Sequence, residues 1–262
     1  MTQTASPLIV HGLKAGYGEH VVLEGIDLEV AKGEIRIVLG GSGCGKSTLL
    51  RSVAGLEPPL AGTVEILGHK IDWSQGLPSE EIFEKMGVLF QGGALMSALS
   101  VGENVALPLR IQQRKLSEDE IKKRVSVKLG QVGLEGAEDK MPGELSGGMR
   151  KRAGLARALV TDPELLFCDE PSAGLDPVTS KELDDLLLEL RKTLGITMIV
   201  VTHELESIRA LADRITFLSG GRVIFEGTVV GAESGGPQEV RDFLARRAGH
   251  NRKPVSALQG AV

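Results

Sequence analysis

The sequence predicts an α/β fold with a mainly parallel core sheet, a strand-rich N-terminal part and a helical insertion. Three observations support this prediction. Short aliphatic runs alternate with helical segments between residues 164 and 225, which favours a parallel sheet with helices on its faces. Strand-like patterning dominates residues 8–67, whereas residues 91–160 have helical periodicity. At 262 residues, the chain is long enough for one large domain with an insertion.

The N-terminal quarter is predicted to consist mainly of strands. Its apolar segments are short, and turn residues separate them. The predicted strands lie at residues 8–13, 21–30, 34–39 and 62–67, with a helix at 47–55 that follows a glycine-rich run. Residues 72–85 are expected to form a polar loop and a short helix, and residues 87–90 a further buried strand.

The middle of the chain is predicted to be helical, and the sheet resumes after it. Helices are expected at 101–107, 118–132 and 147–160. The first should end at Pro108, because proline cannot donate a helical hydrogen bond. The later elements are strands at 164–168, 196–201, 214–218 and 222–225, and helices at 179–193, 204–211 and 238–247. We expect one domain at 1–235, with a helical part at about 92–160, and a C-terminal extension at 236–262 that ends in a frayed tail.

Composition excludes several classes of protein. A net charge of -5 gives no general attraction to nucleic acid or to an anionic bilayer. The longest aliphatic runs, such as 196–201, are far shorter than the roughly 20 residues that span a bilayer, and the first ten residues do not resemble a secretion signal. Cys44 and Cys168 form no disulfide framework, which fits a reducing cytosol. The chain is therefore expected to be soluble by itself.

A glycine-rich loop predicts a phosphate-binding site. The pattern is Gly40-x4-Gly45-Lys46-Ser47, and it lies between a predicted strand and a predicted helix, as phosphate loops do. Glycines let backbone N–H groups approach phosphates, and the helix N-terminus adds partial positive charge. Lys46 would contact the β- and γ-phosphates, and Ser47 would bind Mg²⁺. The expected nucleotide-binding residues are Gly40, Gly41, Ser42, Gly43, Cys44, Gly45, Lys46, Ser47 and Thr48. The plain alternative is a glycine-rich turn that only matches the pattern.

Two adjacent acids follow a buried strand and complete a predicted ATPase site. Asp169 and Glu170 come after four apolar residues, at the end of a strand where open α/β sheets bind their ligands. We expect Asp169 to hold Mg²⁺, largely through water, and Glu170 to act as the base that polarises the attacking water. The alternative is that both acids cap the next helix.

The run Leu145-Ser146-Gly147-Gly148-Met149 resembles the signature of ATP-binding-cassette (ABC) transporter ATPases, and the likeness extends over about residues 8–225. The resemblance implies a P-loop NTPase fold of the ABC ATPase type. Such a fold has a mainly parallel core sheet, an N-terminal antiparallel β-subdomain and a helical subdomain that carries the signature. In this family the signature closes over a nucleotide held by a different subunit. Ser146 and the amides of Gly147 and Gly148 would then form a second anion site, and two copies of the chain would enclose two ATP molecules.

Four further residues match motifs of the same family. The resemblance implies that Tyr17 stacks on adenine, that Gln91 reaches Mg²⁺ and the attacking water, and that His203 contacts the γ-phosphate. Asp176 matches the loop that crosses the dimer interface. Each residue taken alone could instead be an ordinary structural residue. On the signature helix, positive charge is added by Arg150, Lys151, Arg152 and Arg157, and an ordinary solvated basic face is an equal alternative.

Segments 89–95, 104–110, 141–149 and 240–244 resemble ATPases of lipid transporters that work with mammalian-cell-entry (MCE) proteins. This likeness implies phospholipid cargo in a bacterial envelope, an integral-membrane permease, an MCE-domain lipid-binding protein and a small accessory subunit. The chain would lie on the cytoplasmic face of the inner membrane, held there by its permease. An ATPase of an importer for amino acids, ions or other solutes is the alternative. A non-transport cassette that acts as a nucleotide-gated DNA or ribosome factor is disfavoured by the acidic charge, the single copy of each motif and the lack of a long coiled-coil pattern. The C-terminal extension is expected either to dock on the second copy or to act as a tether.

Overall fold

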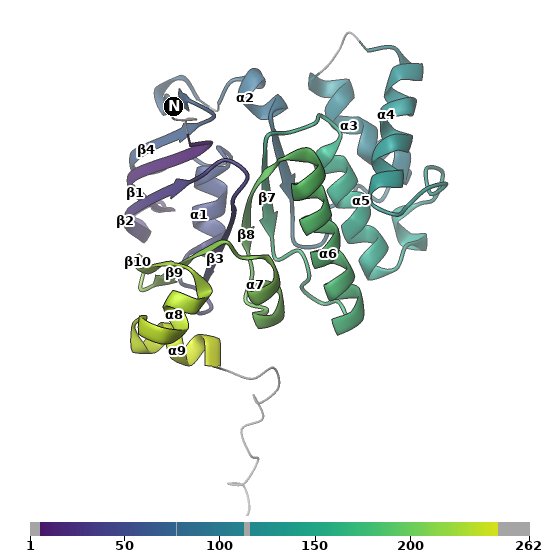
Figure 1. The fold of residues 1–262 in the computed structure, drawn as a ribbon. Helices are drawn as coiled ribbons and strands as arrows, with labels where there is room; N and C mark the ends of the chain where they lie inside the picture. The colour runs from purple at the N-terminus through teal and green to yellow at the C-terminus, as the bar shows by residue number, and fades with distance from the viewer. Residues whose placement is uncertain (1–5, 77, 113–115, 246–262) are drawn as a thin grey trace, which may run out of the picture.

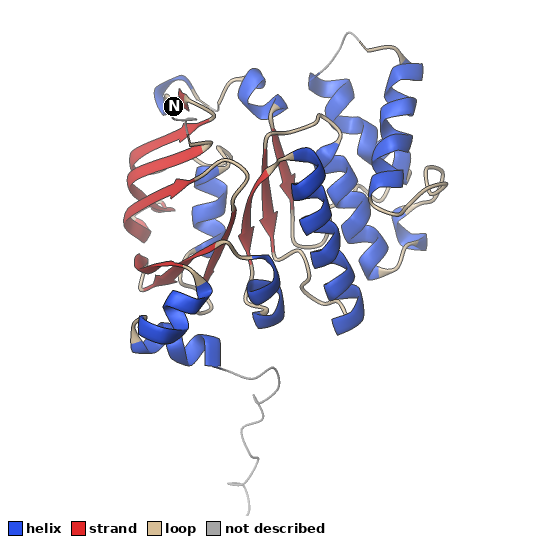
Figure 2. Ribbon diagram, in the orientation of Figure 1, coloured by secondary structure: helices blue, strands red, loops and turns tan. Residues whose placement is uncertain are grey.

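The computed structural model describes residues 6–76, 78–112 and 116–245, which form two sheets and several helices (Figures 1 and 2). The strands are β1 (Leu8–Tyr17), β2 (His20–Val30), β3 (Ile35–Gly40), β4 (Ala61–Ile66), β5 (His69–Lys70), β6 (Met86–Leu89), β7 (Leu165–Asp169), β8 (Thr197–Val201), β9 (Arg214–Ser219) and β10 (Arg222–Gly227). The helices are α1 (Lys46–Val53), α2 (Glu80–Glu84), α3 (Val101–Gln112), α4 (Glu118–Gln131), α5 (Gly147–Leu159), α6 (Pro177–Leu194), α7 (Leu205–Leu211), α8 (Val229–Gly235) and α9 (Gln238–Ala245). The 3₁₀ turns are Trp73–Gln75 and Pro142–Glu144.

The larger sheet has six strands in the order β10-β9-β3-β8-β7-β6. The pairs from β9 to β6 are parallel, and only β10 runs antiparallel to its neighbour. All five residues of β8 are buried, as expected for a central strand covered by helices on both faces. The smaller sheet, in the order β2-β1-β4-β5, is antiparallel. These two sheets confirm the predicted fold class.

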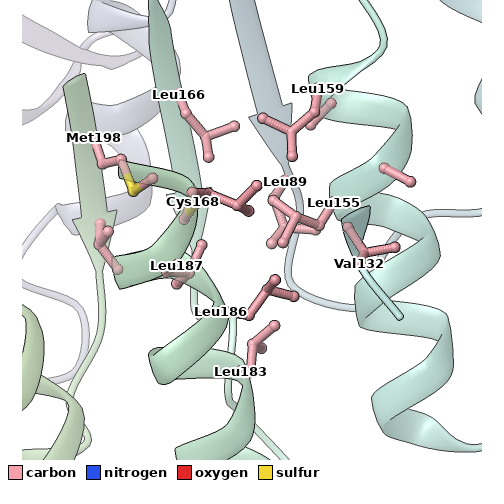
Figure 3. Packing of buried hydrophobic residues seen from close by; sticks show 14 of the residues in the cluster. Leu89, Val132, Leu155, Leu159, Leu166, Cys168, Leu183, Leu186, Leu187 and Met198 are labelled. Carbon is pink, nitrogen blue, oxygen red and sulfur yellow. The ribbon is translucent and has the colours of Figure 1, made fainter. Parts of the chain in front are cut away.

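Two apolar cores hold the layers together. One fills the space between the small sheet, helix α1 and one face of the large sheet. The other lies where α5 and α6 pack on the opposite face of the large sheet, and Figure 3 shows part of it. Leu155 and Leu159 of α5 point toward Leu89 of β6 and Leu166 of β7, and Leu187 of α6 lies in the same cluster. Helix α5 therefore packs on the sheet through a row of aliphatic side chains.

Helix α3 does not end at Pro108, so this prediction is wrong: the helix continues to Gln112. A proline inside a helix loses one hydrogen bond and costs roughly 3 kcal/mol. Here Val101, Val105 and Leu109 are buried in the core formed with α4 and α5, and this packing outweighs the cost. The side chain of Asn104 also fixes the preceding loop, because its amide donates to the carbonyl groups of Met96, Leu99 and Ser100.

The C-terminal part contains one helix that the sequence prediction missed. Helix α8 begins after Thr228, whose hydroxyl accepts a hydrogen bond from the amide of Gly231. A threonine before an apolar pair is the signal that could have found it. Helix α9 packs against β9, where the rings of Phe217 and Phe243 meet edge to face with centroids 5.3 Å apart. The predicted helix end at 246–247 and the predicted frayed tail lie outside the described residues. No helix within residues 6–76, 78–112 and 116–245 is both long and apolar enough to cross a membrane.

A fully buried arginine joins four strands away from the glycine loop. Arg36 of β3 contacts Glu34 Oε1 at 2.5 Å, Glu226 Oε1 of β10 at 2.7 Å and Thr216 Oγ1 of β9 at 3.0 Å. It also donates to the carbonyl oxygen of Glu29 in β2. The side chain of Arg36 is 0 % exposed, so its charge depends on these partners.

We expect Arg36→Met to lower the free energy of unfolding by about 3–5 kcal/mol, because it leaves the Glu34 and Glu226 carboxylates without their buried cation. Chemical denaturation measures this difference. Lys181→Met is the control: it breaks the exposed pair with Asp185, so a change below about 0.5 kcal/mol is expected. Equal effects of the two substitutions would contradict the assignment.

A second buried charge, Asp184 of α6, makes stability depend on pH. The hydroxyl of Ser207 donates to its Oδ2 at 2.7 Å, and its Oδ1 has no hydrogen-bond partner within the described ranges. Burial raises the pKa of Asp184 from 3.8 to about 6. The folded protein therefore holds this proton more tightly than the unfolded chain does. Its stabilising contribution is present below about pH 4 and is lost as the pH rises through 6.

We expect Asp184→Asn to change the free energy of unfolding in a pH-dependent way. Relative to the unsubstituted protein, the variant should be more stable at pH 7.5 than at pH 4 by on the order of 2–3 kcal/mol. The measurement is the difference in unfolding free energy between the two proteins across pH 4–8. Asp185→Asn removes the exposed neighbouring carboxylate, whose charge makes only a smaller contribution to the raised pKa of Asp184, so it should show a much weaker trend. A pH-independent difference for Asp184→Asn would refute the expected linkage.

Candidate active site

Four of the predicted motifs lie at one edge of the large sheet, at the carboxyl ends of its parallel strands. The glycine loop follows β3, and Asp169 and Glu170 lie at the end of β7. His203 follows β8, and Gln91 follows β6. Because β3, β8, β7 and β6 are consecutive neighbours, the four segments lie in a row along this edge.

The glycine loop has a backbone that only glycine adopts easily. Gly40 has φ 151° and Gly45 has φ 103°. A Cβ atom at Gly40 would lie 2.2 Å from the carbonyl oxygen of Leu218, and one at Gly45 would lie 2.5 Å from a methyl carbon of Leu23. Lys46 is the first residue of α1, and its Nζ donates to the carbonyl oxygens of Gly40 and Gly41, both at 3.0 Å. The loop, the helix N-terminus and this ammonium can together hold an anion.

The two acids at the end of β7 each have an unsatisfied oxygen. Asp169 Oδ1 and Glu170 Oε2 are buried and have no hydrogen-bond partner among the described residues. Burial, and then the nearby charge of Glu170, raise the pKa of Asp169, while Arg51, Lys151 and Lys46 oppose this rise. Buried oxygen atoms of this kind are suited to bind a cation or a water molecule. Neither acid caps the next helix: Asp176 does so, accepting from the amides of Val178 and Thr179. Hydrogen bonds from Thr179 also lower the pKa of Asp176.

The structure joins Glu170 and His203 directly, which sequence spacing did not indicate. Glu170 Oε1 lies 2.8 Å from His203 Nδ1. The Glu170 side chain is 13 % exposed and that of His203 is 56 % exposed, so the pair has a buried end and an open end. An acid oriented by a histidine in this way can accept a proton from a water molecule at the sheet edge.

The remaining nucleotide-binding candidates surround the glycine loop. Tyr17 ends β1 and is half exposed, and its hydroxyl lies 3.4 Å from Thr48 Oγ1 on α1. Gly41, Ser42, Gly43 and Ser47 are exposed, and Cys44 is half-buried with its sulfur 3.9 Å from Lys46 Nζ. No group of three or more His, Cys, Asp or Glu side chains in the described part of the chain is arranged to hold a metal ion.

The signature residues lie elsewhere on the molecule. Ser146 caps helix α5 by accepting a hydrogen bond from the amide of Met149 at 3.2 Å. Gly148 lies against α6, where a Cβ atom would come within 2.6 Å of the Thr179 side chain. In Figure 1, α5 and α1 are well separated, with β7 and β8 between them. The signature and the glycine loop are therefore two separate helix N-termini on one chain, and each can hold an anion.

Only Arg150 of the four basic residues of α5 is exposed; Lys151 is buried and Arg152 and Arg157 are partly buried, so the helix is not a uniformly solvated basic face. Lys151 is buried and donates to the carbonyl oxygen of Glu170 at 3.0 Å. Arg150 donates to the carbonyl oxygen of Leu145, Arg152 to that of Val132, and Arg157 to those of Gly93 and Ala94. Sequence reasoning noted these charges but missed their partners. One signal was available: Lys151, Leu155 and Leu159 are spaced four residues apart, which places Lys151 on the buried face.

Comparison with known proteins gives the family of the chain. A family model described as ABC transporter matches residues 23–173, more than half of the chain. The probable ribonucleotide transport ATP-binding protein mkl of Mycobacterium tuberculosis is 41% identical over 241 residues, which cover 92% of this chain and 67% of that protein. The methionine import ATP-binding protein MetN of Caulobacter vibrioides is 41% identical over 212 residues, or 81% of this chain and 63% of that protein. The chain thus spans about two thirds of the length of these relatives.

A solved structure gives the same result for the fold. The ATP-binding cassette MJ0796, in a dimeric post-hydrolysis state bound to ADP and Pi, is 31% identical with a TM-score of 0.74. The match covers 85% of this chain and 98% of that one. The chain therefore belongs to the ABC transporter family, as an ATP-hydrolysing member of it.

Proposed function

We propose that this protein is the ATPase subunit of a membrane ABC transporter and works as a dimer that encloses two nucleotides. The observation that carries this proposal is the separation of two helix N-termini, each of which can hold an anion. One belongs to the phosphate loop beside Asp169 and Glu170, and the other begins at Ser146 on the far side of the chain. Two copies facing each other would bring each loop to the other copy's signature. The dimeric state named for MJ0796 supports this arrangement.

Each proposed role follows from the chemistry of the residue. Residues 40–48 would hold the phosphates through backbone amides and the Lys46 ammonium, and Tyr17 would stack on the adenine. Asp169, Ser47 and Gln91 would hold Mg²⁺, which neutralises phosphate charge when bound. The unsatisfied Asp169 Oδ1 fits this role. Glu170 would accept the proton of the attacking water, and His203 would keep the carboxylate oriented from one side while its exposed edge meets the γ-phosphate.

The partner copy would complete the site. Ser146, Gly147 and Gly148 would donate to a phosphate held by the other chain, with no Cβ in the way at the two glycines. Asp176 would act at the same interface by shaping the start of α6, since its carboxylate is occupied by Val178 and Thr179. Hydrolysis would split ATP into ADP and phosphate, and release of that phosphate would remove the anion that both faces share and let the dimer open.

A groove beside Gln91 is a suitable docking surface for the permease. Its volume is about 340 Å³, and Phe90, Ala94, Leu107, Pro108 and Ile111 contribute to its lining. Ile111 is 57 % exposed and Phe90 is 37 % exposed, so the groove offers apolar surface to a partner helix. Phe90 lines the groove and immediately precedes Gln91. A movement of the permease against Phe90 would therefore shift the backbone of Gln91 at the nucleotide site.

Phospholipid is the cargo that we propose, with an MCE-domain protein and a small accessory subunit as further partners. The support is the likeness of segments 89–95, 104–110, 141–149 and 240–244 to ATPases of MCE-type lipid transporters. The chain would act at the cytoplasmic face of the inner membrane, bound to its permease. The MetN relative supports the second candidate, an importer of amino acids or other solutes, because its name gives methionine import as its activity.

Purification of the native complex separates these candidates. A tagged chain would be isolated from gently solubilised membranes of its own cells, and its partners and lipids identified by mass spectrometry. A permease with an MCE-domain protein and enriched phospholipid is the expected result. A permease with a solute-binding protein and no enriched lipid would establish the importer instead, and co-purified nucleic acid would contradict both.

A further inference from the structure

We infer that Lys151 is a positioning residue for Glu170, and that it couples the signature helix to the orientation of the carboxylate in the same chain. The inference rests on the proposed roles of Glu170 and Ser146. It adds a link between the two active sites of the dimer: the helix that meets one nucleotide at Ser146 would hold the base that acts on the other.

The first support is a single buried contact. Lys151 is 5 % exposed, and its Nζ donates to the backbone carbonyl oxygen of Glu170 at 3.0 Å. Burial lowers the pKa of Lys151, while the charges of Glu170 and Asp169 oppose this shift. An ammonium group is costly to bury unless it is hydrogen-bonded and near opposite charge, and both conditions are met here. Its position is therefore tied to the backbone of Glu170.

The second support is the backbone of Glu170 itself. This residue has φ 47°, a conformation that residues other than glycine seldom adopt and that costs energy unless the surroundings enforce it. Three backbone contacts enforce it: the Glu170 amide donates to Val201 at 2.8 Å, and the Glu170 carbonyl accepts from Ala173 at 3.2 Å and from Lys151. Only the last of these comes from the signature helix. The backbone conformation of Glu170 fixes the direction of its Cα–Cβ bond. It therefore also determines where the carboxylate lies relative to His203.

The third support is the rigidity of the connection. Ser146 caps α5, and Lys151 lies about one and a half turns later on the same helix. The next two turns of this face carry Leu155 and Leu159, which pack on the sheet (Figure 3). A shift at Ser146 therefore moves Lys151 with it rather than being absorbed by a loop. When the signature closes over the partner's nucleotide, Lys151 would hold the Glu170 carboxylate in its active orientation. When the signature withdraws, this orientation would no longer be held.

The test is Lys151→Met in the full chain, assembled with its permease, with ATP and Mg²⁺ as the probe. We expect kcat to fall by about tenfold or more, because a small misplacement of a catalytic group has an effect of this size. KM for ATP should change by less than about twofold, since ATP binding does not depend on the orientation of the carboxylate. Lys151→Gln keeps a hydrogen-bond donor and should retain more of kcat than Lys151→Met.

Lys128→Met is the matched control. Lys128 is also 5 % exposed, and its ammonium pairs with Asp162 at 2.6 Å, outside the active site. We expect this variant to lose stability but keep its kcat. Three results would overturn the inference: normal kcat in Lys151→Met, a loss confined to KM, or equal kcat in the Met and Gln variants. If Lys151→Met fails to fold, the comparison of Lys151→Gln with the unsubstituted protein decides, with a lowered kcat at unchanged KM expected. Failure of the proposed function is distinct, because it would appear as normal turnover in Glu170→Gln.

Discussion

Replacement of Glu170 by glutamine is expected to lower ATP turnover by about 10²-fold or more while leaving ATP binding intact. Glutamine has the size of glutamate and keeps a group that can hydrogen-bond to His203, which lies 2.8 Å from Glu170 Oε1. It cannot accept a proton from the attacking water. Steady-state phosphate release measures the turnover, and a nucleotide-binding titration measures the affinity.

The control for this prediction is Glu204→Gln. Glu204 is also next to His203, with Oε1 3.6 Å from His203 Nε2, but its side chain is 49 % exposed and it lies beyond the end of β8. We expect its turnover to stay within about twofold of the unsubstituted protein. In the Glu170 variant, bound ATP that is not hydrolysed should also prolong the dimer. Near-normal hydrolysis in Glu170→Gln would remove this residue from the role of base.

Replacement of Lys46 by alanine has the second large expected effect, and it acts on binding. Lys46 Nζ contacts the carbonyl oxygens of Gly40 and Gly41 at 3.0 Å, so the ammonium already lies over the loop that would hold the phosphates. A hydrogen bond to a charged group contributes about 1.5–3 kcal/mol, which corresponds to a loss of roughly 10- to 100-fold in ATP affinity. Calorimetric titration with ATP and Mg²⁺ measures it.

Lys32→Ala provides the matched control, because Lys32 is an exposed lysine in the turn before β3 and outside the glycine loop. Its ATP affinity should be unchanged. Unaltered affinity in Lys46→Ala would show that the loop binds phosphate through its backbone amides alone, and would exclude the proposed role of the side chain.

The local parts of the site could be predicted from the sequence. The glycine loop is contiguous from Gly40 to Ser47, and its positive φ angles require glycine at specific places, so composition and spacing reveal it. Local sequence also reveals the two acids that follow a buried strand and the serine with two glycines that begins a helix. The fold class followed from apolar periodicity, because each strand and helix carries its own burial pattern.

Other features depend on contacts between distant segments. His203 and Glu170 are 33 residues apart and Lys151 and Glu170 are 19 apart, and no local pattern states that they touch. The strand order β3-β8-β7-β6 decides that four motifs share one edge. The chemistry of proline predicted that α3 ends at Pro108. The helix continues to Gln112 because it packs against α4 and α5.

The sequence by itself determined which chemical groups the protein has and which short loops present them, because backbone conformation and helix capping depend on neighbouring residues. Tertiary structure alone decided that the Lys151 ammonium is buried against the Glu170 carbonyl and that Glu170 meets His203. The physical reason is that burial and long-range hydrogen bonds arise from the packing of whole helices on a sheet. That packing is a property of the assembled fold rather than of any single segment.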